Sequence, residues 1–259
     1  MAYRNYHTHT ARCKHARGAE EEYIVKAVEN GYDTLGFADH SPWPFADGHV
    51  SGVRMLPEEL GDYVSTLTAL KEKYKDRIDI RIGLECEYYG SMIGWIREQK
   101  EKFGLEYILL GNHTYDETEA FFFNGTDTPE KVRRYTDMVL AGMNTGLYDA
   151  VAHPELPLSG YGAFDGIITD CFTEIIKEAK RLDIPLEYNL QGNYYRSLGK
   201  FRGLGYPHET FWDMAGAEGC RAIVGIDAHF PDMITWTDKI DEARSLLASK
   251  GLTVIDALV

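Results

Sequence analysis

Hydrophobic and polar positions along the chain follow two alternating patterns. Short apolar runs, typical of buried strands, are followed by longer segments with apolar residues three or four positions apart, as in amphipathic helices. The expected strands are an opening strand that ends at His7 and His9, then 34–40, 78–85, 107–113, 148–153, 185–190, 221–229 and a short last strand, 253–258. The expected helices are 19–31, 57–76, 91–103, 128–145, 164–182, 207–218 and 236–249.

Start and stop signals support these assignments. The segment 19–31 has three glutamates in its first turn and ends at Gly31, and the segment 57–76 begins with Pro57. The residues between 191 and 206 are rich in Gly, Tyr and Arg and are expected to form a loop. Seven strand-then-helix units predict a parallel sheet with helical crossovers.

The polar residues at the strand ends favour one architecture. Six of the seven strands in these units deliver metal-binding side chains to their carboxyl ends: His7 and His9, Asp39 and His40, Glu85, His113, His153, and Asp227 with His229. An α/β barrel builds its site at this face, whereas an open doubly wound sheet would gather ligands near one switch point. We therefore expect a distorted seven-stranded (β/α)7 barrel of the TIM type, with residues 1–259 as a single domain.

The opening motif His7-Thr8-His9 would aim two imidazoles to the same side of a strand, because residues two apart share a face. This spacing alone also occurs by chance, and Glu85 or Asp227 taken singly is equally explained as a helix cap. Agreement of the whole set is different. Carboxylates and imidazoles crowded at one face are costly without compensating cations, so the set predicts bound metal ions.

Charge and composition exclude several classes of protein. The 27 basic and 41 acidic residues give a net charge of −14, which opposes broad attraction to nucleic acid or anionic lipid. Bound divalent ions would reverse that field locally, so a phosphate substrate remains compatible. No apolar run approaches the roughly 20 residues of a membrane span, and no signal-peptide pattern is present. We expect a cytoplasmic protein, either a monomer or a small homo-oligomer.

The cysteines predict no disulfide framework. Cys13, Cys86, Cys171 and Cys220 are widely spaced and form no CxxC motif, so they are expected to be reduced thiols. Cys13 and Cys86 lie beside predicted ligands and could touch the site. Imidazole and carboxylate ligands suit zinc, iron or manganese, and the set is too large for one ion. Two or three divalent ions could generate a hydroxide and hold the oxygen atoms of a displacement at phosphorus.

These motifs resemble those of the PHP (polymerase and histidinol phosphatase) family of metallohydrolases, over nearly the whole chain. The family fold is a distorted seven-stranded α/β barrel with three metal ions. The resemblance implies one ion held by His7, His9, Glu85 and Asp227, a second held by Glu85, His113 and His153, and a third held by His15, His40 and His229. Glu85 would then bridge two ions.

Within this family the chain is most similar to the histidinol-phosphatase branch. The similar segments are Cys13-Lys14-His15-Ala16, Asp39-His40-Ser41-Pro42, Arg54-Met55, Gly83-Leu84-Glu85-Cys86-Glu87-Tyr88, Leu186-Glu187-Tyr188-Asn189 and Tyr206-Pro207. The chain departs from the branch at Leu110-Gly111-Asn112-His113-Thr114 and at Tyr194-Tyr195-Arg196. Both departures concern the leaving group rather than the metals. The resemblance implies a phosphomonoesterase with L-histidinol phosphate as its substrate.

Roles for individual residues follow from this interpretation. Guanidinium groups match phosphate, which makes Arg17, Arg196 and Arg202 candidate substrate-binding residues. Protonation of the leaving alkoxide would fall to Asp227 or His229. The segment 191–206, which includes Tyr194, and the run Phe121-Phe122-Phe123 follow barrel strands, so both are expected to form the leaving-group pocket.

Several alternatives remain open. The same barrel could carry a phosphatase or phosphodiesterase for another small phosphate ester, such as a nucleotide, or an amidohydrolase-like metal hydrolase. An amidohydrolase often places a bridging lysine on a middle strand, where this chain has Glu85. The protein could also be a binding module without catalysis, or a proofreading domain of a polymerase. The full ligand set argues against the binding module, and the length of the chain argues against the proofreading domain.

Overall fold

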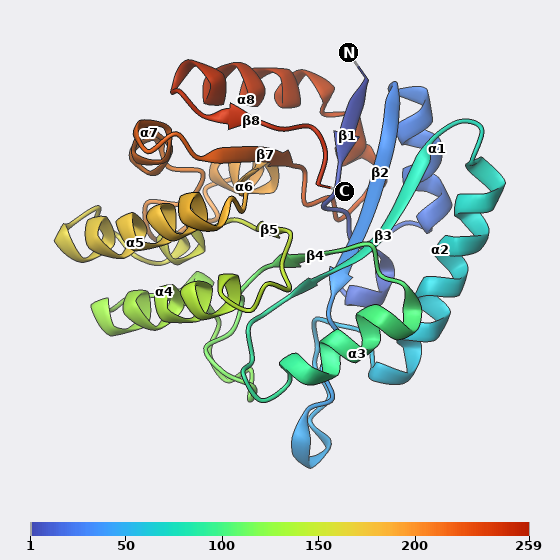
Figure 1. Cartoon of the computed structure of the whole chain (residues 1–259), viewed down its shortest axis with the longest axis horizontal. Coiled ribbons are helices and arrows are strands. Elements are labelled where there is room, and N and C mark those ends of the chain that lie inside the picture. The colour runs from blue at the N-terminus through green and yellow to red at the C-terminus, as the bar shows by residue number, and fades with distance from the viewer. Residues whose placement is uncertain (1, 259) are drawn as a thin grey trace.

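The backbone is built around one curled parallel sheet, shown in a computed structural model that describes residues 2–258 (Figure 1). Its eight strands are neighbours in the order of the chain, from β1 to β8. The strands are β1 (Tyr3–Asn5), β2 (Tyr32–His40), β3 (Asp79–Cys86), β4 (Tyr107–Leu110), β5 (Ala150–Val151), β6 (Leu186–Asn189), β7 (Arg221–Gly225) and β8 (Thr253–Val254). The alternating strands and helices are confirmed.

The count of seven strands in the sheet is wrong by one, because the short last strand joins it. Thr253 N donates to Cys220 O at 3.0 Å, and β8 pairs with the start of β7. Beyond the regular strands, a single parallel bridge links Thr8 to Ala228. At the carboxyl end of the sheet, the segment after β1 therefore pairs directly with the segment after β7. The short strand β8 pairs with β7 at the amino end. This arrangement curls the sheet so that its strand ends face one another.

Helices cover the outside of the curled sheet (Figure 1). The α-helices are α1 (Glu20–Glu29), α2 (Leu60–Tyr74), α3 (Ile93–Phe103), α4 (Pro129–Met143), α5 (Gly166–Leu182), α6 (Leu190–Ser197), α7 (Glu209–Ala217) and α8 (Thr237–Ser249). Short 3-10 helices are η1 (Ala11–Cys13), η2 (Ala46–Gly48), η3 (Pro57–Glu59), η4 (Phe123–Gly125), η5 (Leu156–Ser159) and η6 (Pro231–Thr235). From residue 2 to residue 258, each helix is too short or too polar to cross a membrane.

Helix α6 begins at the last residue of the predicted strand 185–190 and continues into the segment that the sequence predicts to be a loop, so the loop prediction is wrong for 191–197. The side chain of Asn189 caps the helix by accepting a hydrogen bond from Gly192 N at 2.9 Å. Gly192 also lies where a Cβ would meet the ring and carbonyl of Tyr206 at 2.5 to 2.7 Å. A helix of eight residues is marginal by itself, so the cap and this tertiary contact stabilise it.

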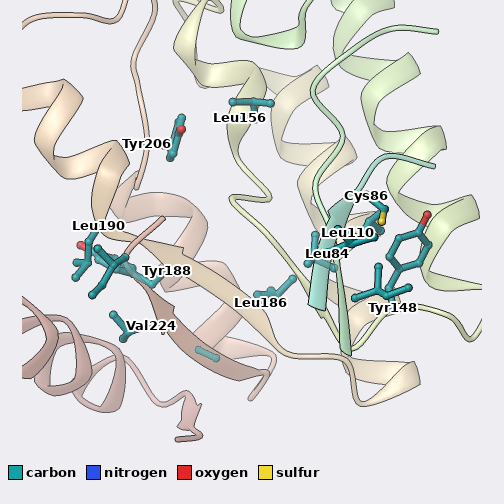
Figure 2. Close-up of a cluster of buried hydrophobic side chains, with 14 of the residues drawn as sticks. Leu84, Cys86, Leu110, Tyr148, Leu156, Leu186, Tyr188, Leu190, Tyr206 and Val224 are labelled. Atoms are coloured by element: carbon teal, nitrogen blue, oxygen red, sulfur yellow. The ribbon is translucent and has the colours of Figure 1, made fainter. Parts of the chain in front are cut away.

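Two apolar layers lie on opposite faces of the sheet. The inner layer consists of Tyr6, Ala38, Tyr107, Leu109, Ala150, Ala152 and Ile223. The outer layer faces the helices and includes Leu84, Leu110, Leu186 and Val224 (Figure 2). Consecutive residues such as Leu109 and Leu110 point to opposite faces, as the period of two in a strand requires. The inner layer fills the space below the strand ends and supports the polar site above it.

Tyr107 and Tyr6 have the largest side chains of the inner layer, and two glycines make room for Tyr107. A Cβ on Gly83 would lie 2.7 Å from the Tyr107 ring, and a Cβ on Gly36 would lie 2.5 Å from its hydroxyl. The hydroxyl donates a hydrogen bond to Tyr6 O at 2.6 Å. This bond ties β4 to the end of β1, immediately before the first predicted metal ligand.

Candidate active site

The nine predicted metal ligands lie together at the carboxyl end of the sheet. They come from the segments after β1, β4, β5 and β7 and from the ends of β2 and β3. A cavity of about 520 Å³ opens above them. The ligands that line it are His15, His40, Glu85, His113, His153, Asp227 and His229, and His7 and His9 lie fully buried behind it. The structure thus brings the whole predicted set into one site.

Glu85 lies at the centre of this cluster and faces two groups of histidines. Its Oε1 is 2.8 Å from Nε2 of His153 and 3.3 Å from Nε2 of His113. Its Oε2 is 3.3 Å from Nε2 of His7 and 3.4 Å from Nε2 of His9. Nδ1 of His40 lies 3.1 Å from the same Oε2. The two oxygens therefore face separate groups of imidazoles, which is the arrangement that a bridging carboxylate needs.

Asp227 completes the group on the His7 side. Its Oδ1 lies 3.1 Å from Nε2 of His9 and 3.5 Å from Nε2 of His7. The backbone of Asp227 has φ = 57°, and that of His153 has φ = 29°. Residues other than glycine rarely adopt positive φ, and such strain clusters at functional sites. The chain therefore keeps both side chains aimed into the cluster at a cost in backbone energy.

A third group lies at the rim. Nε2 of His229 is 2.9 Å from Nε2 of His15. His229 also belongs to a set with His9 and His40 in which the possible ligand atoms lie within 4.8 Å of one another. Cys13 forms another such set with His15 and His229. The sequence singled out Cys13 only as a neighbour of predicted ligands, and the structure places its thiol among them.

The geometry of the cluster fits divalent metal ions. Four ligands at about 2.0 to 2.2 Å from a tetrahedral ion are about 3.3 to 3.6 Å from one another, close to the separations seen here. Within residues 2–258, Oε2 of Glu85, Oδ1 of Asp227 and Nδ1 of His40 are buried and lack a hydrogen bond of good geometry, although Nδ1 of His40 lies 3.1 Å from Oε2 of Glu85. Buried polar atoms are normally satisfied. Cations at this point would satisfy these three.

Electrostatics support the same interpretation. Burial raises the pKa of Glu85, but the surrounding imidazoles of His113 and His7 outweigh it and hold this pKa well below its usual range. Burial lowers the pKa of His113, yet Glu85 and Glu87 together raise it to about 9. For Cys13, burial opposes ionisation, but hydrogen bonds with His15, His229 and His9 lower its pKa to about 2. The cluster therefore holds carboxylates ionised next to groups that carry or attract positive charge.

Glu187 is a site residue whose role the sequence did not reveal. Its Oε1 lies 2.7 Å from Nδ1 of His7, and its Oε2 accepts hydrogen bonds from His153 N at 3.1 Å and from Asn189 Nδ2 at 3.0 Å. Gly225 faces it, and a Cβ there would overlap the Glu187 carboxylate. The sequence did contain a signal for Glu187. Glu187 and Asn189 are polar residues two positions apart at the end of the sixth strand, so they share one face of that strand, and among the seven strand-then-helix units this is the strand without a predicted ligand.

A second orienting network holds His113. Oε1 of Glu87 lies 3.0 Å from Nδ1 of His113 and accepts from the Arg54 guanidinium at 2.9 Å. Oε2 of Glu87 accepts from Trp43 Nε1 at 2.8 Å and from Arg54 at 3.0 Å. Glu87 is fully buried and Arg54 is 1% exposed. His113 is thereby fixed with Nε2 toward Glu85, and Arg54 compensates the buried carboxylate.

The four predicted substrate-binding residues lie in different places. Arg202 lines the main cavity. Arg17 and Tyr194 line a neighbouring pocket of about 340 Å³ that also contains His229. Arg196 turns away and donates a hydrogen bond to the carbonyl of Pro207 at 2.7 Å.

The two predicted recognition segments contribute different residues to the cavity. From the phenylalanine run, Phe122 lines the cavity and Phe123 is buried in the core. From the segment after β6, the lining residues are Gln191, Tyr195, Lys200, Phe201, Arg202 and Tyr206. The aromatic wall therefore comes from Tyr195, beside the Tyr194 that the sequence singled out. Helix α6 determines which of the two tyrosines faces the main cavity, because adjacent residues of a helix point in different directions.

Comparison with known proteins shows the family. Residues 5–190 match the model of the PHP domain. A Schizosaccharomyces pombe protein named "Probable histidinol-phosphatase" is 30% identical over 95% of this chain and 86% of its own length. A Deinococcus radiodurans protein with the same name is 25% identical over 93% of this chain and 92% of its own length.

A solved structure has the same fold. It is the histidinol phosphate phosphatase of Lactococcus lactis in complex with zinc, L-histidinol and phosphate, and it superposes with a TM-score of 0.73. The match covers 98% of this chain and 95% of that protein, at 19% identity. With the sequence match over most of the chain and the convergent histidines and carboxylates of the site, the protein belongs to the PHP domain family.

Proposed function

We propose that the protein is a metal-dependent histidinol phosphatase, which hydrolyses L-histidinol phosphate to L-histidinol and phosphate. The observation that carries the proposal is the cluster around Glu85, whose two carboxylate oxygens face separate groups of histidines below an open cavity. The names of the relatives in Schizosaccharomyces pombe and Deinococcus radiodurans supply the substrate. The proposal includes a single domain over residues 1–259 and a barrel of the PHP type.

Three groups of residues would hold two or three divalent ions, of zinc, iron or manganese. His7, His9 and Asp227 would hold one with Glu85, and His113 and His153 would hold a second on the other oxygen of Glu85. The third would lie at the rim, beside His15, His40 and His229. Ions there would supply positive charge against the phosphoryl oxygens and lower the pKa of water at the site.

The protein side chains would orient the substrate and move the proton. Arg202 and Lys200 line the cavity and offer positive charge to the phosphate. Asp227 and His229, the two candidates for protonating the leaving alkoxide, both face the cavity. Burial raises the pKa of Asp227, but His7 and His9 outweigh it and hold this pKa well below its usual range, so the proton would come from His229. Nδ1 of His229 is occupied, because it lies 2.6 Å from Gln191 Nε2 and 3.0 Å from the carbonyl of Asp227. Nε2 is then the free nitrogen of His229, and because it lies 2.9 Å from Nε2 of His15 it would donate a proton only while it is not bound to the third ion.

One observation favours a second candidate, a phosphatase for a more anionic ester such as a nucleotide. Lys200 and Arg202 line the cavity, as does Arg54, whose charge is compensated by Glu87 and Glu119. The lining carboxylates are Glu85 and Asp227, both assigned to metal. Histidinol carries a positively charged amine, which would need a carboxylate or aromatic ring as its partner. Phe122, Tyr195, Phe201 and Tyr206 provide rings for such a cation.

A substrate panel decides between these candidates. Phosphate release should be measured with L-histidinol phosphate, nucleoside monophosphates and a small aryl phosphate, together with the metal content of the purified protein. We expect two or three ions per chain and the highest kcat/KM with L-histidinol phosphate. A higher kcat/KM with a nucleotide would replace the first candidate by the second. Full activity after exhaustive removal of metal would overturn both.

A further inference from the structure

Cys13 is held inside the site by the local backbone. It ends the 3-10 helix η1, whose first turn is capped by Thr10, and it is fully buried. The next residue, Lys14, adopts φ = 67°, which reverses the chain. Because of this reversal, His15 returns over Cys13, with its Nδ1 2.6 Å from the carbonyl of Cys13. The thiol and the imidazole thus approach the same space from one short turn.

The sulfur atom is surrounded by groups that serve metal ions. Sγ of Cys13 and the ligand atoms of His15 and His229 all lie within 4.8 Å of one another. The backbone N–H of Ala16 donates to Sγ at 3.2 Å, an interaction that stabilises a negatively charged sulfur. The ring of His40 borders the same region, with its centroid 5.4 Å from that of His15, and its Nδ1 faces Oε2 of Glu85 at 3.1 Å. These are separate observations that point to a cation beside the sulfur.

A second group around Cys13 has a different explanation. Cys13 also lies within 4.8 Å of His9 and Asp39. However, Asp39 Oδ2 accepts a hydrogen bond from Thr10 N at 3.2 Å, and its Oδ1 lies 3.5 Å from Nδ1 of His9. Asp39 therefore orients His9, whose Nε2 faces Asp227. Of these two groups, the one formed by Cys13, His15 and His229 is therefore the candidate set of metal ligands.

We propose that Cys13 is a thiolate ligand of the third metal ion, together with His15 and His229. This inference rests on the metal centre of the proposed function and assigns one further ligand to it. The thiol would lose its proton to solvent as the ion binds, because the thiolate is the ligand form. The third site would then be softer than the other two, which contain only imidazole and carboxylate ligands, and would select zinc over manganese.

Spectroscopy on the metal-loaded protein tests the assignment without relying on activity. In the zinc-loaded protein, X-ray absorption at the zinc edge should contain a sulfur shell at about 2.3 Å. In the cobalt-loaded protein, a sulfur-to-cobalt charge-transfer band should appear in the near ultraviolet. Cys13→Ser should remove both signals and weaken retention of one ion per chain by roughly tenfold or more. Cys171→Ser, at a buried cysteine of helix α5, should keep both signals.

The outcomes separate this inference from the proposed function. A sulfur signal in the parent protein that disappears in Cys13→Ser supports the assignment. A parent protein that contains two or three ions and releases phosphate but has no metal–sulfur signal would overturn the assignment and leave the phosphatase intact. A protein that retains no metal would overturn both. Because the X-ray measurement uses the parent protein, the test stands even if Cys13→Ser fails to fold.

Discussion

Nδ1 of His7 donates a hydrogen bond to the carboxylate of Glu187, with 2.7 Å between the two heavy atoms. An ionised carboxylate only accepts, so the hydrogen is on Nδ1 and the lone pair of Nε2 faces Glu85 and Asp227. Glu187 thereby selects the form of His7 that can bind a metal ion. The same carboxylate also accepts from the backbone N–H of His153, so it positions residues of both metal groups.

Glu187→Gln should therefore weaken metal binding although it removes no ligand. The amide would place an NH2 group against the N–H of His153 and the side-chain amide of Asn189, which are both donors. We expect the metal affinity to fall roughly 10- to 100-fold, measured by competition with a chelator. Glu58→Gln, at an exposed carboxylate, is the matched control. Unchanged affinity in Glu187→Gln would mean that Glu187 does not position His7.

Glu85→Gln should damage catalysis more than His15→Ala. Both oxygens of Glu85 face imidazoles, whereas His15 lies at the rim beside His229. Loss of the bridging charge affects two ions, while loss of His15 affects one. The kcat/KM of the two variants, measured with one substrate at saturating metal, gives the comparison. Equal losses would indicate that the rim ion takes part directly in the reaction.

Arg54→Met should lower the stability of the protein strongly. The Arg54 guanidinium is buried and makes hydrogen bonds to both oxygens of Glu87, so its removal leaves a buried carboxylate without compensation. Such a loss costs about 3–5 kcal/mol. Arg181→Met, which removes an ion pair with Glu178 at the surface, should cost no more than about 1 kcal/mol. The free energy of unfolding in denaturant compares the two, and equal effects would contradict the role assigned to Arg54.

Glu155 should make stability depend on pH. Burial raises the pKa of Glu155 to about 8, although the N–H groups of His208 and Trp212 oppose this shift. Its pKa in the unfolded chain is about 4.3, so between these values the folded state binds more protons. The contribution of Glu155 to stability therefore falls as pH rises from about 4.3 to about 8, and it is constant above and below that window.

The neutral variant Glu155→Gln isolates this effect. Relative to Glu155→Gln, the parent protein should lose thermal stability progressively between pH 5 and pH 8, with no further relative change above pH 9. Melting temperatures of both proteins at fixed ionic strength provide the measurement. Glu58→Gln should follow the parent at every pH. A parallel pH dependence of the parent and Glu155→Gln would show that Glu155 titrates as it does in the unfolded chain.

Arg202→Ala and Tyr194→Ala should have different effects on turnover. Arg202 lines the main cavity, whereas Tyr194 packs against Phe230 and Trp236 with ring centroids 6.2 and 5.4 Å apart. We expect Arg202→Ala to lower kcat/KM tenfold or more, about 1.4 kcal/mol, for both histidinol phosphate and an aryl phosphate. Tyr194→Ala should change either value little. A selective loss with histidinol phosphate in Tyr194→Ala would assign leaving-group recognition to Tyr194.

The sequence by itself determined which strands end in candidate metal ligands. The spacing of His7 and His9 and the repeated polar residues after apolar runs depend on a period of two and on parallel strands, which are local properties of the chain. The same patterns predicted the order of strands and helices. Family motifs then assigned the candidate ligands to separate ions. His113 and His153 lie on one oxygen of Glu85, and His7, His9 and also His40, which the motifs assign to the third ion, lie on the other.

Tertiary structure decided the remaining features, because they depend on contacts between segments far apart in the chain. Helix α6 requires the contact of Gly192 with Tyr206, and β8 requires the edge of β7. Glu187 reaches His7 from 180 positions away, which no local period reveals. The turn at Lys14 places Cys13 beside His229, which follows a strand at the other end of the chain. Residue type identified which groups could bind metal, and packing determined which of them meet.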